Sequence, residues 1–209
     1  MHYSVRDANS KGVKSIIDVL AKSGKPRKKL AAFICRAMKI RIETALQQLV
    51  GLQVSGSTRA SDMECLKFGH QQIIDQRGML CNVGLFALHL QCAWRITNGT
   101  ELLIGSSDLY IPASETDDIN ENFDWEISGA NLRDYKLQEL LGLKLLVDSV
   151  KADAYGGFSL FLDQKIVLEG FPACSMKDDY SEYWRLLDNR FGPGQSQHFV
   201  VRPTGAEDE

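Results

Sequence analysis

The sequence lacks any apolar stretch long enough to cross a membrane. A spanning helix needs roughly 18 or more consecutive apolar residues, and charged residues interrupt every candidate. Near the N-terminus, Lys14 and Asp18 interrupt a run that includes Val13, Ile16 and Val19. This pattern is typical of an amphipathic helix and not of a signal peptide, so we expect no membrane contact and a cytoplasmic location.

A disulfide framework is also lacking. The chain has five cysteines, an odd number, with no Cys-x-x-Cys pair: Cys35, Cys65, Cys81, Cys92 and Cys174. The cysteines of a small secreted protein would be even in number and dense. We therefore expect reduced thiols, mostly buried as small apolar side chains, which again favours the cytoplasm.

The spacing of histidine and cysteine argues against a metal site. Cys65 and His70 are one candidate pair, and His89 and Cys92 are the other. In a strand, His89 and Cys92 would lie on opposite faces, and the short knuckles of structural zinc sites are missing. We assign no metal ligand.

Motifs for catalysis and for phosphate binding are missing as well. There is no G-x-S-x-G, no Walker sequence and no G-x-G-x-x-G. The acidic segment 115–126 lacks the spacing of a calcium-binding EF-hand, and we interpret it as a solvated loop. We assign no catalytic residue and no cofactor, and we favour a protein that is not an enzyme.

The charge is distributed unevenly along the chain. Residues 1–45 carry eleven of the 24 Lys and Arg residues but three of the 27 Asp and Glu residues. The remaining chain is therefore strongly acidic. Such a split favours either a surface for nucleic acid or another acidic partner, or two parts of one assembly that attract each other.

The basic N-terminal part has the pattern of helices. A first helix would end near Ser23, and Pro26 suits the first turn of a second. Apolar residues then recur at helical spacing: Leu30, Phe33, Ile34, Ala37 and Met38. The pattern stops at Gly51, and whether residues 26–50 form one helix or two stays open.

After Gly51 the apolar period falls to about two, which is typical of strands. Asn98-Gly99 between two apolar runs predicts a tight hairpin, and Asp163-Gln164 predicts a second. We predict one antiparallel sheet over residues 52–202, with a helix that ends at Gly142. The predicted fold class is α+β, with an antiparallel β-sheet core, helices packed on it and an N-terminal basic helical extension.

Three regions follow from these patterns. Residues 1–45 form the basic helical extension, residues 46–203 form the antiparallel-sheet α+β domain, and residues 204–209 form a disordered tail.

The predicted strand 83–96 gives the candidate site. Its even positions from Phe86 to Ile96 are all apolar and include Trp94, which we expect to be buried. The other face turns polar at His89, Gln91 and Arg95. These three residues would line a cleft, or would form an ordinary solvated face. Together with Asp108, which follows in the sequence, they are the candidate binding residues: His89, Gln91, Arg95 and Asp108.

Several segments resemble a family of small uncharacterised bacterial proteins. They are Leu88–Ile96, Gly105–Tyr110, Gly156–Phe158, Glu182–Arg185 and His198–Val201. The resemblance covers about residues 43–202 and implies a bacterial source without a known activity. Small acidic proteins of this kind also resemble the immunity proteins that neutralise bacterial toxins, an analogy of fold and size.

Three functions remain open. The first is a non-enzymatic protein-binding protein, immunity-like or regulatory, with a protein partner or a homodimer. The second is a small-ligand binder or enzyme that uses the polar face of strand 83–96, with His89 as acid or base and Arg95 as anion clamp. The third is nucleic-acid binding through the basic helices 11–41, above all through Lys25, Arg27, Lys28 and Lys29.

Overall fold

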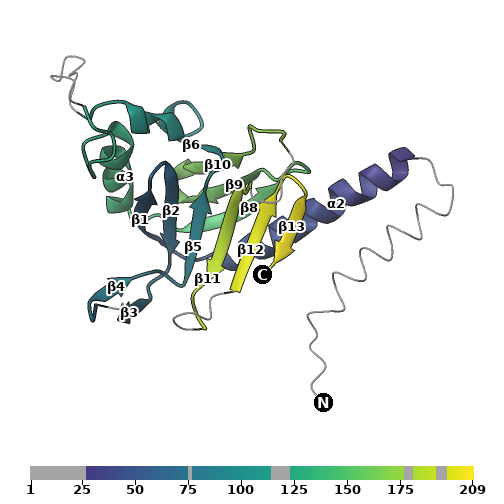
Figure 1. Ribbon diagram of the computed structural model, residues 1–209, viewed down its shortest axis with the longest axis horizontal. Helices are drawn as coiled ribbons and strands as arrows, with labels where there is room; N and C mark the ends of the chain where they lie inside the picture. The colour runs from purple at the N-terminus through teal and green to yellow at the C-terminus, as the bar shows by residue number, and fades with distance from the viewer. Residues whose placement is uncertain (1–26, 75–76, 114–122, 177–180, 192–196) are drawn as a thin grey trace.

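The strands of the chain form two antiparallel sheets that pack face to face (Figure 1). The structure is a computed structural model that gives residues 27–35 as backbone alone. The residues that it describes are 27–74, 77–113, 123–176, 181–191 and 197–209.

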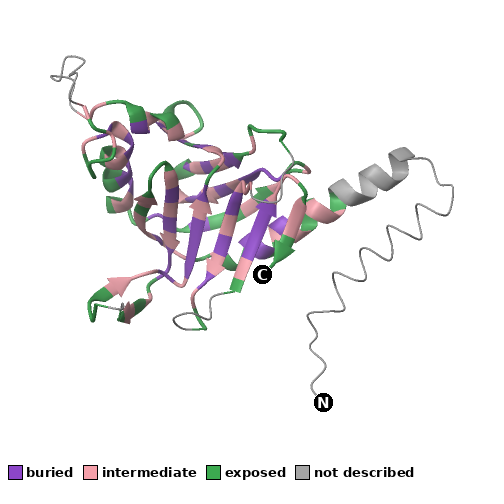
Figure 2. Ribbon diagram, viewed as in Figure 1, coloured by how far each residue is buried: buried purple, intermediate pink, exposed green. Residues whose placement is uncertain are grey.

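The front sheet in Figure 1 has six strands in the order β1-β2-β5-β11-β12-β13. Buried positions alternate with half-buried ones along β2 and β11 (Figure 2), as expected for strands with one face toward a core. The strands are β1 (Val54–Ala60), β2 (Met63–Phe68), β5 (Phe86–Leu90), β11 (Trp184–Asp188), β12 (Gln197–Arg202) and β13 (Gly205–Asp208).

The rear sheet has five strands in the order β7-β6-β10-β9-β8, which run across those of the front sheet (Figure 1). A separate two-stranded ribbon, β3-β4, projects from the body. The strands of the rear sheet and the ribbon are β6 (Ala93–Thr97), β7 (Leu102–Gly105), β8 (Val147–Ala152), β9 (Phe158–Leu162), β10 (Val167–Phe171), β3 (Gln72–Ile74) and β4 (Leu80–Asn82).

Helices close the two sides of the sandwich. α3 (Leu132–Gly142), with the 3-10 turn η2 (Ser106–Tyr110), contacts the edge strands β1 and β7. α2 (Arg27–Leu46), followed by the 3-10 turn η1 (Gln47–Leu49), contacts β8 and β13. The third 3-10 turn, η3 (Asp163–Lys165), joins β9 to β10. Residues 27–49 thus form one α-helix followed by η1.

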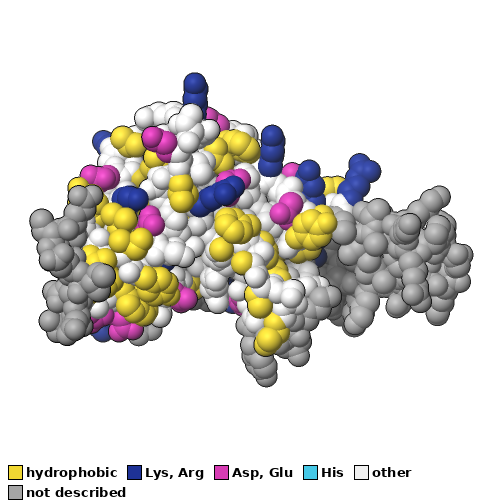
Figure 3. Space-filling model, turned by 90° about the horizontal axis from the view of Figure 1, so that it is seen from above, with side chains coloured by type: hydrophobic (Ala, Val, Ile, Leu, Met, Phe, Trp, Pro, Cys, Tyr) yellow, Lys and Arg dark blue, Asp and Glu magenta, His cyan; other side chains and the backbone are white. Residues whose placement is uncertain are grey.

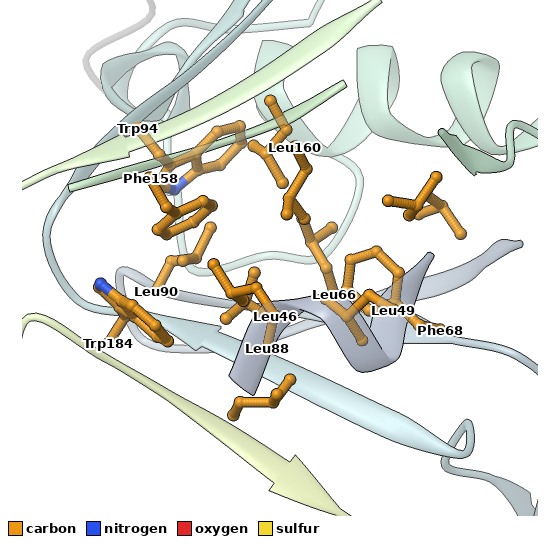
Figure 4. Packing of buried hydrophobic residues seen from close by; sticks show 14 of the residues in the cluster. Leu46, Leu49, Leu66, Phe68, Leu88, Leu90, Trp94, Phe158, Leu160 and Trp184 are labelled. Atoms are coloured by element: carbon orange, nitrogen blue, oxygen red, sulfur yellow. The ribbon is translucent and has the colours of Figure 1, made fainter. Parts of the chain in front are cut away.

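The core fills the space between the sheets. Leu46 and Leu49 from the helical segment lie among Leu66 and Leu88 of the front sheet and Leu160 of the rear sheet (Figure 4). Trp94, predicted to be buried, is 2% exposed.

The predicted α+β class is wrong, because the protein is mainly β. The apolar face of each sheet is covered by the other sheet, and the two α-helices of the described residues sit at the sides. The apolar face of a sheet must be buried against another element, and a second sheet can bury it as well as a helix can.

The prediction of a single sheet is also wrong, and the error lies in the strand 83–96. The chain leaves the front sheet after Leu90 and enters the rear sheet at Ala93. At the corner, the N–H groups of Gln91 and Cys92 both donate to the carbonyl of Tyr183, at 3.0 and 2.8 Å. Strands that switch sheets through such a bend are typical of crossed packing. The alternation is confirmed at Phe86, Leu88, Leu90, Trp94 and Ile96, which are buried. It fails at two positions: Cys92, at the bend, is only partly buried, and Ala87 of the other face is buried.

Both predicted hairpins form. In the first, Ile96 pairs with Ile104, and the Asn98 side chain accepts from the N–H groups of Thr100 and Glu101. Gly99 there has a φ of 89°, which favours glycine. The second joins β9 and β10.

The structure differs from the predicted regions at two places, near residue 45 and after residue 203. The boundary between residues 45 and 46 falls inside α2, whose Ile42, Ala45 and Leu46 belong to the core. The tail 204–209, predicted to be disordered, contains β13, which pairs with β12. Charged residues are common on such edge strands. The acidic sequence of the tail therefore did not suggest that it forms β13. Arg41 of α2 and Asp208 of β13 form an ion pair at 3.1 Å.

Candidate functional site

His89 lies on the outer face of the six-stranded sheet, in register with Cys65 of β2 and Arg185 of β11. The guanidinium of Arg185 lies 3.0 Å from Nδ1 of His198. Because arginine stays protonated, His198 accepts this hydrogen bond. Partial burial, and then the positive charge of Arg185, hold the pKa of His89 below its usual value.

Glu182 organises the charges around this histidine. Its carboxylate accepts from Arg185 Nε at 2.8 Å and from Arg202 at 3.2 Å, and Gln91 Nε2 lies at 3.5 Å. Burial alone would raise the pKa of Glu182, but the two guanidinium groups hold it below its usual value. Arg202 also pairs with Glu207. Glu182, Arg185, Arg202 and Glu207 on this outer face therefore neutralise one another.

Arg95 and Asp108 lie elsewhere. Arg95 is on the outer face of the five-stranded sheet, where it pairs with Glu169 at 2.7 Å and lies 5.7 Å from the Phe171 ring. Asp108 accepts from the N–H of Gly105 at 3.1 Å and pairs with Lys136 at 3.4 Å. It therefore stabilises η2 and ties it to α3.

The four candidate binding residues thus lie in three different places. Of the four, the structure brings together His89 and Gln91 alone. His89 and Arg95 lie on the outer faces of different sheets, because the chain changes sheet between them. His89, Gln91 and Arg95 therefore do not line a single cleft, which was one of the two alternatives for the polar face of strand 83–96. Lys25 lies outside the described residues, and of Arg27, Lys28 and Lys29 the structure gives the backbone alone.

A buried ion pair lies beneath α3. Glu64 of β2 and Arg133 of α3 are each 1% exposed, and Arg133 Nε lies 3.3 Å from Glu64 Oε2. Ser57 donates a hydrogen bond to the other carboxylate oxygen. Burial raises the pKa of Glu64, and the hydrogen bond from Ser57 and the charge of Arg133 oppose that rise.

Arg133 holds several elements together. Its Nη1 donates to the carbonyls of Asp62 and Ser106, at 3.1 and 3.3 Å, and its guanidinium lies 5.8 Å from the Trp94 ring. The β1–β2 turn, η2, α3 and the rear sheet therefore meet at one side chain.

Arg59 fixes the turn that follows the acidic segment. Its Nε pairs with Asp134 at 3.1 Å, and its Nη2 donates to the carbonyls of Trp125 and Glu126, at 2.9 and 2.7 Å. The guanidinium also lies 6.0 Å from the Trp125 ring. Side-chain donors thus hold the backbone of residues 125 and 126 in place.

We call Arg59, Arg133 and the groups that they bind the frame. Near this frame lies a group of apolar side chains that we call the aromatic patch: Tyr110, Ile111, Trp125, Ile127 and Tyr135. Four of them are exposed by 47–59%, and Trp125 is half-buried. Figure 3 shows hydrophobic side chains gathered on the side of the molecule where α3 lies.

Short contacts join the segments that carry the aromatic patch. The Tyr110 and Trp125 rings meet edge to face at 5.6 Å. Leu132 N donates to Ile111 O at 2.8 Å, and Ala130 N donates to Ile127 O at 3.2 Å. The backbone that carries Ile111 and Ile127, and the ring pair of Tyr110 and Trp125, are therefore held in place.

The rim of the aromatic patch is acidic. The nearby cations Arg59, Arg133 and Lys136 are each paired with a carboxylate. Asp124, Glu126 and Glu139 are exposed, and no ion pair of theirs occurs among the described residues. The surface thus combines an apolar centre with a negative rim.

Sequence reasoning missed the aromatic patch. None of its five side chains was among the candidate binding residues. The sequence could have identified Tyr135. It lies two residues from the buried Leu137 and therefore points away from the apolar face of its helix. An aromatic residue on the polar face of a helix, next to an acidic segment, predicts an interface.

The remaining groups offer little chemistry. Burial raises the pKa of Cys92 to about 12, which keeps its thiol protonated and unreactive. In the part of the chain that the structure describes, no three His, Cys, Asp or Glu side chains gather where they could hold a metal ion. Over the same residues, no helix is long and apolar enough to cross a membrane.

No protein-family model, no curated protein and no solved structure matches this chain.

Proposed function

We propose that this is a non-enzymatic protein-binding protein, immunity-like or regulatory, which engages its partner through the aromatic patch. The observation that carries the proposal is the set of large apolar side chains held exposed on a rigid frame. Tyrosine and tryptophan dominate the energetics of protein interfaces, and large exposed apolar patches on a soluble protein commonly mark interaction sites.

The acidic rim supports a partner with a basic surface. Complementary charge speeds association and selects among partners more than it adds affinity. The centre of the contact would be apolar, with Tyr110, Trp125 and Ile127 as anchors, and Asp124 and Glu126 would meet Lys or Arg of the partner.

A cytoplasmic location is part of the same proposal. Its support is the pattern of the five cysteines, which are odd in number and scattered along the sequence without a Cys-x-x-Cys pair, as suits a reducing compartment.

A capture experiment tests the proposal. The full chain is immobilised and exposed to an extract of the organism that makes it, beside the Trp125→Ala and Ile127→Asp variants. Tyr155→Ala is the matched control, because Tyr155 is 78% exposed and lies outside the aromatic patch. We expect one protein to be held by the wild type and by the control and to be lost from both patch variants.

Salt provides the second readout. The screening length falls from about 10 Å at 0.1 M to about 3 Å at 1 M salt, so a basic partner should be released as salt rises. If the patch variants and the control capture the same proteins, the proposal is overturned.

A further inference from the structure

The β6-β7 hairpin turns at Asn98-Gly99, which is the one Asn-Gly pair in the sequence. Gly99 and Thr100 are exposed, and Asn98 is half-buried. A β-carbon on Gly99 would meet no atom within 4 Å, so the space around this residue is open. Water and hydroxide can therefore reach the backbone nitrogen of Gly99.

Hydrogen bonds fix the side-chain amide of Asn98. Its Oδ1 accepts from the N–H and the hydroxyl of Thr100, at 3.1 and 2.9 Å, and from the N–H of Glu101 at 2.9 Å. Its Nδ2 donates to the Glu101 carboxylate at 3.4 Å. Three donors on one carbonyl oxygen stabilise negative charge there. They therefore favour attack by a nucleophile on Cγ of Asn98.

The chain itself supplies a nucleophile. The backbone nitrogen of Gly99 directly follows the carbonyl of Asn98, so its bond to Cγ would close a succinimide ring. Among the described residues, the N–H of Gly99 donates no hydrogen bond. A reaction between two groups of one chain has a high effective concentration, and glycine has no side chain to shield its nitrogen.

Asn131 has the contrary arrangement. Its side chain also accepts a backbone hydrogen bond, from Asp134 N at 2.9 Å, but it is 0% exposed. The nitrogen that follows it, Leu132 N, donates to Ile111 O at 2.8 Å. Asn131 therefore has neither access to water nor a free nucleophile beside it, and it serves as an internal control.

We infer that Asn98 is a site of spontaneous deamidation. The nitrogen of Gly99 bonds to Cγ of Asn98, and the bond from Cγ to Nδ2 breaks. The proton of the Gly99 N–H passes through solvent to the departing nitrogen, which leaves as ammonia. Water then adds to either carbonyl of the succinimide ring and opens it, which leaves aspartate or isoaspartate at this position. The reaction needs no co-reactant except water.

The product changes the hairpin. Isoaspartate adds a methylene group to the main chain inside the turn, where the register pairs Ile96 with Ile104. The aged chain should therefore unfold at a lower urea concentration than the fresh chain. The turn is separate from the aromatic patch, and the inference does not depend on the proposed function.

Incubation of the full chain in heavy-oxygen water at mildly alkaline pH tests the inference. Peptide mass spectrometry with fragmentation then locates the label. We expect one heavy oxygen atom at position 98 and none at Asn131. Thr100→Val is the matched variant, because it keeps the shape and the backbone N–H of residue 100 but removes the hydroxyl donor to Oδ1. It should be labelled several-fold more slowly. Circular dichroism confirms that the variant is folded.

The same incubation in urea separates the effect of the turn from that of the sequence. The folded chain should be labelled at position 98 at least as fast as the unfolded chain. If the folded chain stays unlabelled while the unfolded chain reacts, the turn protects Asn98 and the inference is overturned. Equal labelling of Asn98 and Asn131, or an unchanged rate in folded Thr100→Val, would also overturn it.

Discussion

The outer face of the six-stranded sheet and the aromatic patch are opposite kinds of surface. On the sheet face, Glu182, Arg185 and His198 bind one another. At the aromatic patch, Arg59 and Arg133 bind backbone carbonyls and a buried carboxylate underneath, and the side chains that face solvent are apolar. The comparison teaches that a group of polar side chains is a poor guide to a binding site when these side chains already form hydrogen bonds and ion pairs with one another.

The largest expected difference between the two regions concerns stability. Arg133→Ala leaves the buried Glu64 carboxylate without its cation, and breaking a buried pair in this way costs about 3–5 kcal/mol. Arg185→Ala removes a partly exposed pair and should cost about 1 kcal/mol or less. Chemical denaturation measures both values.

A double variant completes this comparison. Arg133→Leu combined with Glu64→Leu removes both charges, and replacement of a whole buried pair by apolar residues is often nearly neutral. It should therefore be more stable than Arg133→Ala. If Arg133→Ala costs no more than Arg185→Ala, the buried pair does not support the aromatic patch.

The strand patterns of this sequence were enough for the local structure. Asn98-Gly99 identified the β6-β7 hairpin, and the alternation from Phe86 to Ile96 identified which side chains are buried. The same pattern does not identify β1, because its Ser55, Gly56 and Ser57 show no apolar alternation. The change of sheet between β5 and β6 could not be predicted from the sequence, because the alternation of apolar residues continues on both sides of the bend at Gln91.

The candidate site was less predictable than the fold. His89 and Gln91 are close in sequence, but the groups that neutralise their surroundings, Glu182 and Arg185, come from about ninety residues later in the chain. Sequence spacing cannot show that a charge already has a partner. The aromatic patch is assembled from three separate segments outside the strands, so no period connects its members.

A smaller effect is expected from pH, and it belongs to the sheet face. The pKa of His89 is lowered by burial and then by Arg185. The unfolded chain therefore binds a proton at His89 more readily than the folded one does. Stability should be highest above the ordinary histidine pKa of about 6.5 and should fall as the pH drops below it.

Urea denaturation between about pH 5 and pH 8 measures this dependence. His89→Gln should flatten the part of the curve just below pH 6.5, and Ile127→Ala, a change in the aromatic patch, should leave the curve unaltered. An unchanged slope in His89→Gln would show that this histidine is equally solvated in both states.

The most direct test of the account is the affinity for the captured partner, measured by titration calorimetry. Tyr110→Ala and Ile127→Ala should each weaken binding about ten-fold or more, which corresponds to about 1.4 kcal/mol. Arg185→Gln, on the sheet face, should leave the affinity unchanged. The account is contradicted if Arg185→Gln abolishes binding while both patch variants bind as tightly as the wild type.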